Sequence, residues 1–366
     1  LTALPAAELK RTFERVAREQ ERSVFMLGTS PPAPLVTELD DGGLLWHVLP
    51  PPSDLAVVYP RLLRRVQAYL KERASNAKDG ALRLALSSSL RAEDVDMASS
   101  IDASLVLNGK NRQELDRASY RRYALEAETV DDGKSYVDAL VDLFEFRPHV
   151  VVAVDDDVFI TNILRVLESA WEQVEDGQER PFYVLSPAQA RSATLESALL
   201  EFPTLAQRVV GVAPAVARDT ELHAAYLSDL ASRNTDLLQV DGGESYYDAA
   251  YFLLYAAAAS GAPEPSGKEL ASGMQRLLDG APFSMGEPQI PEVLGALRDP
   301  NASVALYGTL GAPDFDRSTG ARRHGEGSVW CVTLEGDEDV MFHYDALSLD
   351  ASNDGLVGEL ECIPGF

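Results

Sequence analysis

The stretch that decides the fold is DGGESYYDAAYFLLYAAAAS, residues 241–260. It opens with a polar Gly-Gly turn, passes through Tyr-Asp-Ala at residues 247–249, and continues as an apolar helix that ends at Gly261. A second stretch, GTLGAPDFDRSTG at residues 308–320, follows later in the chain. The apolar run is shorter than the ~18 residues that a membrane span needs, so it is typical of a helix in a protein core.

The composition is strongly acidic, with 58 Asp and Glu residues against 32 Lys and Arg and a formal net charge of −26. Nucleic-acid binders need the opposite sign, because neutralising phosphates supplies much of their affinity. Direct binding to anionic lipid is disfavoured for the same reason. The 366 residues, of which 46% are hydrophobic and 25% charged, suffice for two globular lobes with acidity as a solubility feature.

Short apolar runs alternate with helical patterns along most of the chain, which favours an α/β fold with parallel sheets. HVVVAV at residues 149–154 is almost wholly apolar, as expected for a strand buried on both faces. Short antiparallel strands are predicted at 328–334, 339–344 and 356–362. The other expected strands are 23–27, 44–48, 82–86, 182–185, 208–212 and 304–307, and the expected helices are 4–22, 54–74, 135–144, 159–173, 220–232, 246–259 and 268–278. Residues 263–267 and 279–291 read as Gly/Pro-rich loops.

The two quoted stretches, in this order, resemble the type I periplasmic solute-binding proteins, the leucine/isoleucine/valine-binding family. In that family the Tyr-Asp-Ala helix re-enters the first lobe, and the Gly-rich stretch forms a G-x-x-x-FD-x-x-G turn. The resemblance runs from about Ser23 to about Leu334. It implies a two-lobed fold with lobe 1 at residues 1–89, lobe 2 at 90–240, a return to lobe 1 at 241–323, and a hinge crossing with C-terminal strands on lobe 2 at 324–366.

The chain departs from the family at its start, where further strand-and-helix units of lobe 1 have no counterpart. Without them lobe 1 would expose a sheet edge and an apolar helix face. Two explanations remain open: an upstream segment has been removed or left out, which we prefer, or a second chain fills the gap.

Ligands in such folds lie at the carboxyl ends of parallel strands, which makes four strand ends candidates. Thr29 and Ser30 lie in the turn that holds the ligand carboxylate in amino-acid binders, but Pro32 stands where the family has threonine. Ser88 and Ser89 follow the next strand and could bind a ligand or cap the following helix.

Three carboxylates, Asp155, Asp156 and Asp157, come directly after HVVVAV. They could bind a cation or a polyol, or they could cap the next helix and face solvent. Ser186 and Gln189 follow the fourth strand. The family commonly neutralises the ligand ammonium with a glutamate here, and Ala188 takes its place, which argues against a standard branched amino acid.

The return crossing supplies the remaining candidates, Glu244, Tyr246 and Tyr247. Tyr247 matches a family aromatic that faces the ligand, and it could instead pack into lobe 1.

The two cysteines, Cys331 and Cys362, lie in or beside C-terminal strands. They could form a disulfide in an oxidising compartment or remain two separate buried thiols. No paired histidine accompanies them, so a zinc site is not expected. The five histidines form no metalloprotease motif, and there is no GxSxG elbow or phosphate-binding loop, so we expect neither an enzyme nor a cofactor.

The sequence therefore predicts an exported solute-binding or sensing protein, periplasmic or attached to the cell surface. It would capture a small polar ligand by hinge closure and work with a membrane transporter or receptor. The alternative is a structural or protein-interaction module that kept the scaffold and lost the ligand.

Overall fold

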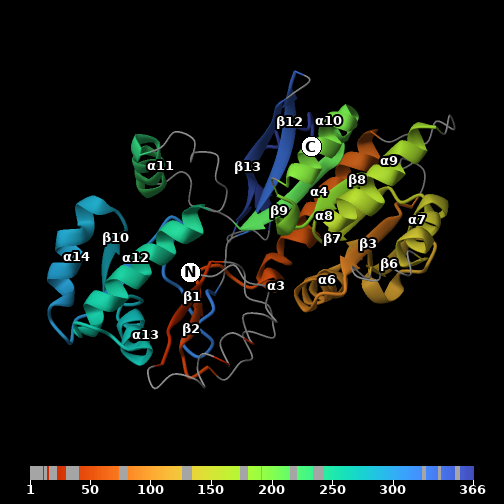
Figure 1. Ribbon diagram of the computed structural model, residues 1–366. Helices are drawn as coiled ribbons and strands as arrows, with labels where there is room; N and C mark the ends of the chain where they lie inside the picture. The colour runs from red at the N-terminus through yellow and green to blue at the C-terminus, as the bar shows by residue number, and fades with distance from the viewer. Residues whose placement is uncertain are drawn as a thin grey trace. The chain divides into compact units, whose positions relative to one another are not determined.

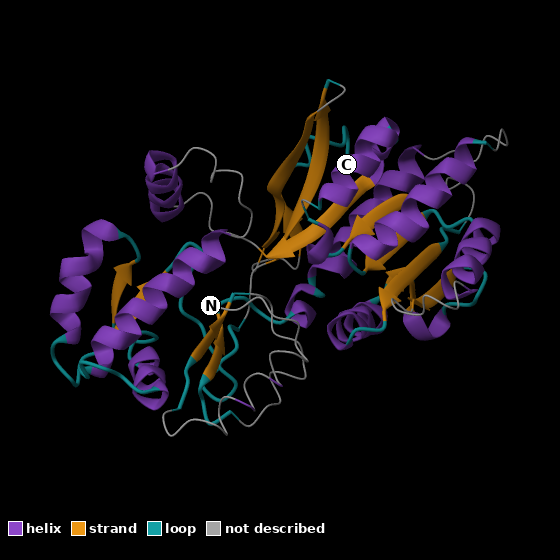
Figure 2. Ribbon diagram, viewed as in Figure 1, coloured by secondary structure: helices purple, strands orange, loops and turns teal. Residues whose placement is uncertain are grey.

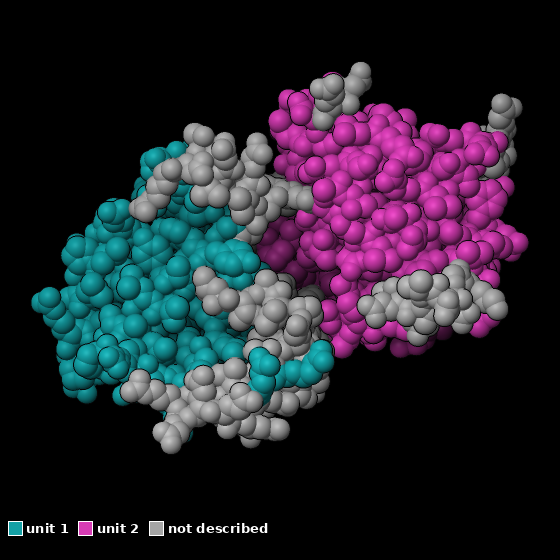
Figure 3. Space-filling model, in the orientation of Figure 1, with its two compact units in different colours: residues 1–54, 215–325 teal, residues 55–214, 326–366 magenta. Residues whose placement is uncertain are grey.

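The computed structural model describes residues 11, 15, 23–29, 41–73, 81–125, 134–173, 180–190, 192–214, 221–233, 243–323, 327–336, 339–350 and 355–366. The chain divides into two compact units, coloured separately in Figure 3. Unit 1 comprises Leu1–Asp54 and Ala215–Gly325, and unit 2 comprises Leu55–Pro214 and Glu326–Phe366. The helix expected over residues 4–22 lies almost wholly outside the described residues.

Unit 2 is built on one eight-stranded sheet with the order β14-β13-β12-β9-β8-β7-β3-β6 (Figure 1). Its first five strands in chain order run parallel, and the last three are antiparallel, which confirms the predicted α/β architecture. The strands are β3 (Leu84–Ser89), β6 (Tyr120–Leu125), β7 (Val150–Val154), β8 (Phe182–Leu185), β9 (Val209–Pro214), β12 (Gly327–Glu335), β13 (Asp339–Asp350) and β14 (Gly355–Val357).

Helices cover both faces of this sheet, as Figure 2 shows. Alternate residues of β7 belong to different cores: Val150, Val152 and Val154 pack with α4 (Val58–Arg73) and α6 (Ala92–Ser104), whereas Val151 and Ala153 pack on the opposite face. This alternation explains the unbroken apolar run of the strand. The helices of the second face are α7 (Lys134–Phe146), α8 (Asp157–Phe159), a π-helical turn (Ile160–Leu164), α9 (Arg165–Glu172) and α10 (Ala193–Glu201).

Smaller elements complete unit 2. A short hairpin of β4 (Val106–Leu107) and β5 (Lys110–Asn111) follows α6, and α3 (Pro52–Leu55) precedes α4 at the unit boundary.

The units differ from the lobes expected from the sequence. Residues 55–89 belong to unit 2 and not to the first lobe, because β3 pairs with β6 and β7 and the apolar face of α4 joins the same core. The helix α11 (Glu221–Arg233), expected in lobe 2, belongs to unit 1. The crossings lie at residues 54/55, 214/215 and 325/326.

Unit 1 contains two separate two-stranded parallel sheets among its described residues. One pairs β1 (Met26–Gly28) with β2 (Leu45–His47), and the other pairs β10 (Ala281–Ser284) with β11 (Val304–Tyr307). Three helices, α12 (Gly243–Ser260), α13 (Gly267–Gln275) and α14 (Ile290–Leu297), share one apolar core with both sheets. Helices α12 and α13 pack closely at Gly273. A Cβ at this position would lie 2.0 Å from the carbonyl oxygen of Ala256, so only glycine fits.

The two stretches that carry the family resemblance are bonded to each other. The Asp248 carboxylate, in the first turns of α12, accepts hydrogen bonds from the amide and hydroxyl of Thr309, both at 2.8 Å, and from the amide of Leu310 at 3.0 Å. A Cβ on Gly308 would lie 2.2 Å from that carboxylate. Glycine at the start of GTLG is therefore required by the buried aspartate of Tyr-Asp-Ala.

Strand β10 corrects the expectation of a loop over residues 279–291. Its second residue, Pro282, has no backbone N–H and is unusual inside a strand, so the sequence pattern did not indicate a strand here. The amide of Met285 donates to the carbonyl of Tyr307 at 2.8 Å and extends the pairing with β11. In the part of unit 1 that the structure describes, β10 has β11 as its one strand neighbour.

A buried ion pair ties α9 to the amino ends of β8 and β9. Glu168 is fully buried and contacts the Arg208 guanidinium with both oxygens, at 2.6 and 3.1 Å. The Tyr183 hydroxyl donates to the same carboxylate at 2.9 Å. Arg180 donates a fourth hydrogen bond to the Glu168 carboxylate, at 3.3 Å. Together these hydrogen bonds compensate a buried charge that would otherwise be costly in the core.

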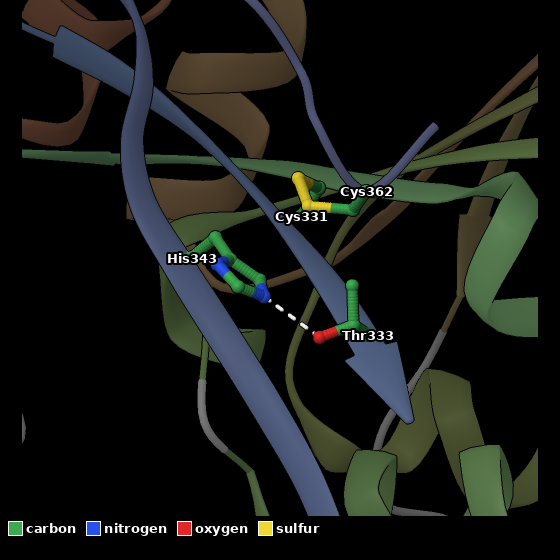
Figure 4. The surroundings of a disulfide bond; sticks show 4 residues. All are labelled: Cys331, Thr333, His343 and Cys362. Carbon is green, nitrogen blue, oxygen red and sulfur yellow. Dashed lines mark hydrogen bonds between the residues drawn. A yellow bond between two sulfur atoms is a disulfide. The ribbon is translucent and has the colours of Figure 1, made fainter. Parts of the chain in front are cut away.

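A disulfide joins Cys331 on β12 to Cys362 in the C-terminal segment, which confirms this pairing over two separate thiols (Figure 4). The segment beyond it packs inward: Ile363 is fully buried, and the Phe366 ring stacks on that of Phe182 with centroids 5.7 Å apart. Beside the disulfide, Thr333 Oγ1 and His343 Nε2 share a hydrogen bond of 2.7 Å across β12 and β13.

Candidate ligand site

Polar side chains gather at the carboxyl ends of β3, β7 and β8 in unit 2. The strand register places Ser87 beside Ala153 and Ser88 beside Val154, so the serine run ends level with Asp155. Ser186 follows β8, and its hydroxyl donates to the carbonyl of Asp155 at 2.6 Å. The structure therefore brings three of the four predicted strand ends together within one unit.

Four polar atoms at this edge are buried without a hydrogen-bond partner among the described residues. They are the hydroxyls of Ser87, Ser88 and Tyr136 and the Oδ2 atom of Asp155. Ser87 and Ser88 are completely buried, and Asp155 is only 1% exposed. Buried polar atoms are normally hydrogen-bonded. Several unpaired ones at one strand edge therefore indicate a site where a polar ligand could supply the missing partners.

The environment of Asp155 shifts its ionisation. Burial raises the pKa of its carboxyl to about 7, although the amide of Asp156 donates to Oδ1 at 2.8 Å. Burial is also the main cause that raises the pKa of Tyr136 to about 12, with the charge of Asp155 second. Asp155 can therefore present either a carboxylate or a neutral carboxyl group near neutral pH.

Arg91 bridges the strand ends. Its guanidinium contacts Asp94 at 2.7 Å and Asp156 at 2.9 Å, and Ser89 donates to the same Asp94 at 2.6 Å. The charge of Arg91 is thus shared between two carboxylates, which leaves it poorly suited to hold a ligand anion.

The remaining predicted residues of unit 2 have structural partners. Asp156 caps α8 by accepting from the amide of Val158 at 2.9 Å, and Asp157 accepts from the hydroxyl of Thr194 at 3.0 Å. The Gln189 side chain is buried; it accepts from the amide of Ser186 at 3.0 Å and donates to the carbonyl of Asp156 at 3.2 Å. Gln189 therefore holds two strand ends together.

The predicted ligand residues of unit 1 do not form one cluster: each has a different environment. Thr29 is 5% exposed just after β1, and Ser30 lies outside the described residues. Glu244 contacts His223 of α11 at 3.3 Å. Tyr247 packs between the rings of Tyr226 and Tyr251, with centroid distances of 4.9 and 4.8 Å, whereas Tyr246 is 44% exposed.

Sequence reasoning missed Arg91, Asp94 and Tyr136. Arg91 and Asp94 lie at the start of α6, a helix that the serines could cap but whose bounds were not predicted. Tyr136 reaches the edge from α7 with no motif to mark it. No group of His, Cys, Asp and Glu residues in the described ranges could hold a metal ion. None of the described helices is long and apolar enough to cross a membrane.

Comparison with known proteins gives a match in structure and none in sequence. No family model matches the chain, and no curated protein sequence matches it. A leucine-binding protein from Thermotoga maritima is similar in structure, with a TM-score of 0.57, 12% identity, and coverage of 93% of this chain and 84% of that one.

Two further solved structures are similar at comparable levels. One is an ABC transporter solute-binding protein from R. palustris in complex with benzoate, with a TM-score of 0.55, 12% identity, and coverage of 98% of this chain and 78% of that one. The other is an ABC transporter substrate-binding protein from Sphaerobacter thermophilus, with a TM-score of 0.50, 13% identity, and coverage of 93% and 78%. The chain therefore has the fold of the type I periplasmic-binding proteins.

Proposed function

We propose that this protein is an exported solute-binding protein that captures a small polar ligand and carries out no covalent chemistry. The single observation that carries the proposal is the set of orphaned polar atoms on Ser87, Ser88, Tyr136 and Asp155 at the carboxyl edge of the parallel strands. This is the edge where ligands bind in open α/β sheets. The similar structures, which include a leucine-binding protein and a solute-binding protein in complex with benzoate, support the role of solute binding.

The chemistry of the edge favours a ligand rich in hydrogen-bond donors. Asp155 offers an acceptor in its charged form, and the serine hydroxyls can accept or donate. Arg91, the cation that the described residues place at this edge, is already neutralised by Asp94 and Asp156. A polyol or an amine therefore fits this half of the site better than a carboxylate, in line with the loss of the family's amino-acid anchors.

Ligand entry requires the orphaned atoms to be uncovered. Arg91 is 40% exposed and bridges the two strand ends, so we infer that entry breaks its contact with Asp156. A partly exposed ion pair is a weak restraint, worth roughly 0–1 kcal/mol, and can open readily.

The test is native mass spectrometry of protein purified from its natural source, followed by denaturing release of any bound molecule. We expect a co-purifying polyol or amine on the wild type. Rebinding of that molecule should weaken about tenfold or more in Asp155→Asn, because a hydrogen bond to a charged group is worth ~1.5–3 kcal/mol. Glu145→Gln, on the exposed side of α7, is the matched control and should bind as the wild type does.

One observation favours the second candidate, a ligand-free interaction module. Tyr247, which matches a family aromatic that faces the ligand, packs against Tyr226 of α11, and its neighbour Glu244 contacts His223 of the same helix. Bare protein held in a defined oligomer, with no small molecule released on denaturation, would overturn solute binding in favour of this module. A bound protein fragment would identify a partner of this module.

A further inference from the structure

A second candidate site lies wholly within unit 1. A hollow of about 550 Å³ opens at the carboxyl ends of the parallel strands β10 and β11. Its walls come from the first turn of α11 (Glu221 and Leu222), from the end of β10 (Phe283 and Ser284) and from the end of β11 (Tyr307 and Gly308). A volume of this size suits a small organic molecule.

The walls of this unit 1 hollow combine apolar surface with two aromatic side chains. Phe283 is half-buried in the core of unit 1, and Tyr307 is 41% exposed. Leu222 of α11 also packs against that core. Aromatic pairs contribute about 0.5–1.5 kcal/mol beyond the area they bury, so these two side chains favour a ligand with a ring.

Polar atoms around the hollow are open to a ligand. The side chains of Glu221, Ser284 and Tyr307 make no hydrogen bond or ion pair with any other residue in the described ranges. Gly308 and Gly311, by contrast, bond to each other through their backbones, at 2.9 and 3.0 Å, and so form a closed floor.

The charge of the hollow has one sign. Among the described residues that line it, Glu221 is the one carboxylate, and none of them is a Lys, Arg or His. The whole chain carries a net charge of −26, so its long-range field adds to the attraction for cations. A carboxylate ligand would meet repulsion here, whereas a protonated amine would meet its complement.

Strand addition is not the use of this edge. Pro282 removes a backbone donor from the short strand β10, so an added peptide strand could not form a regular ladder there. A small molecule at the strand ends needs no such ladder.

We propose that the hollow of unit 1 binds a small amine that carries one aromatic ring. The ring lies against Phe283 and Tyr307, and the ammonium group pairs with Glu221. This site uses none of the residues of the unit 2 edge, so it can be tested independently of the proposed solute site.

The experiment compares three probes of nearly equal size on the full chain: phenethylamine, 2-phenylethanol and 3-phenylpropanoate. Affinity is measured by isothermal titration calorimetry, and the site is mapped by hydrogen exchange. We expect phenethylamine to bind best, 2-phenylethanol more weakly and 3-phenylpropanoate least. Protection should appear in peptides covering residues 281–285 and 304–311 and not in those covering 153–158.

Variants separate charge from ring contact. Glu221→Gln should lower phenethylamine affinity about threefold to fivefold, the range of an exposed ion pair, and should leave 2-phenylethanol within twofold. Tyr307→Ala should lower the affinity of both about tenfold, while Tyr307→Phe should retain the ring contact. Glu292→Gln on α14, exposed and outside the hollow, is the matched control.

Three outcomes would overturn the proposal. The first is no saturable binding of any probe at millimolar concentration. The second is equal binding of the three probes with no response to Glu221→Gln or Tyr307→Ala. Protection confined to residues 153–158 would also reject the unit 1 site while supporting the solute site of unit 2.

Discussion

At the scale of single residues, Asp155 and His149 flank β7 and titrate in opposite senses. Burial raises the pKa of Asp155 to about 7, and burial, with the charge of Arg83 second, lowers the pKa of His149 to about 4. As pH rises from about 4 to about 7, unfolded Asp155 loses a proton that the folded form keeps, so its contribution to stability falls. Below about pH 6.5 the unfolded chain protonates His149, whereas the folded protein keeps it neutral down to about pH 4. The contribution of His149 to stability therefore rises as pH rises over nearly the same range.

The two trends oppose each other, which predicts a flat stability profile for the wild type in this window. Asp155→Asn removes the falling trend. Its free energy of unfolding should therefore increase between about pH 4.5 and 6.5 by roughly 2 kcal/mol more than that of the wild type. Urea denaturation at several pH values measures this difference. Glu145→Gln should follow the wild type, and an Asp155→Asn profile parallel to the wild type would refute the assignment.

At the scale of elements, the pair between Glu168 and Arg208 fastens α9 to the sheet of unit 2. Glu168→Ala leaves the Arg208 guanidinium and the Tyr183 hydroxyl without their shared acceptor, so the free energy of unfolding should fall by about 3–5 kcal/mol. Chemical denaturation followed by circular dichroism measures the loss.

An exposed ion pair between α9 and α10 supplies a control. Glu201 pairs with Arg165, but both side chains are about 40% exposed, at 44% and 35%. Glu201→Ala should cost no more than about 1 kcal/mol, the range of a surface ion pair. If the two substitutions cost the same, burial is not what gives the Glu168 cluster its strength.

The sequence pattern predicted some strands with their observed bounds, and it missed other elements for physical reasons. Residues 182–185 and 304–307 were predicted with their observed limits, because apolar strands bounded by turns are easy to recognise. Strand β6 was missed, since its YRRYAL sequence places arginines on an edge strand, and β10 was missed because of its proline. The bounds of helix α6 were not predicted, because Asp94 is buried and Val95 is exposed, which leaves no clear apolar period.

The candidate site was predictable only where strand ends mark it. Asp155, the serines after β3 and Ser186 follow apolar strands directly, so the rule of carboxyl ends located them. Tyr136 comes from a helix whose placement depends on the packing of the second face, which no local pattern encodes. The engagement of Tyr247 by α11 likewise depends on a tertiary contact.

At the scale of the whole molecule, each unit has its own core, and the disulfide lies entirely within unit 2. It joins residues 31 positions apart, for which loop-closure entropy gives about 3–4 kcal/mol. Reduction should therefore lower the unfolding free energy of unit 2 by about that amount and leave unit 1 unchanged. Hydrogen exchange at increasing denaturant, with and without reductant, reads the two units separately.

Peptides from β9 and β12 should lose protection at lower denaturant after reduction, while those from α12 and β11 should not shift. The double variant Cys331→Ala with Cys362→Ala should behave as the reduced protein does. An equal shift in both sets of peptides would show that the units unfold as one, against the division into two cores.

Pro282 also bears on how the protein behaves in a crowded compartment. Open strands are the usual starting points of fibres, because each new copy can continue the ladder of the last. The pyrrolidine ring of Pro282 within β10 interrupts that ladder, and the surplus of negative charge keeps approaching copies apart. Among the described strands of unit 1, β10 is the most exposed, and one imino acid thus protects it against self-association.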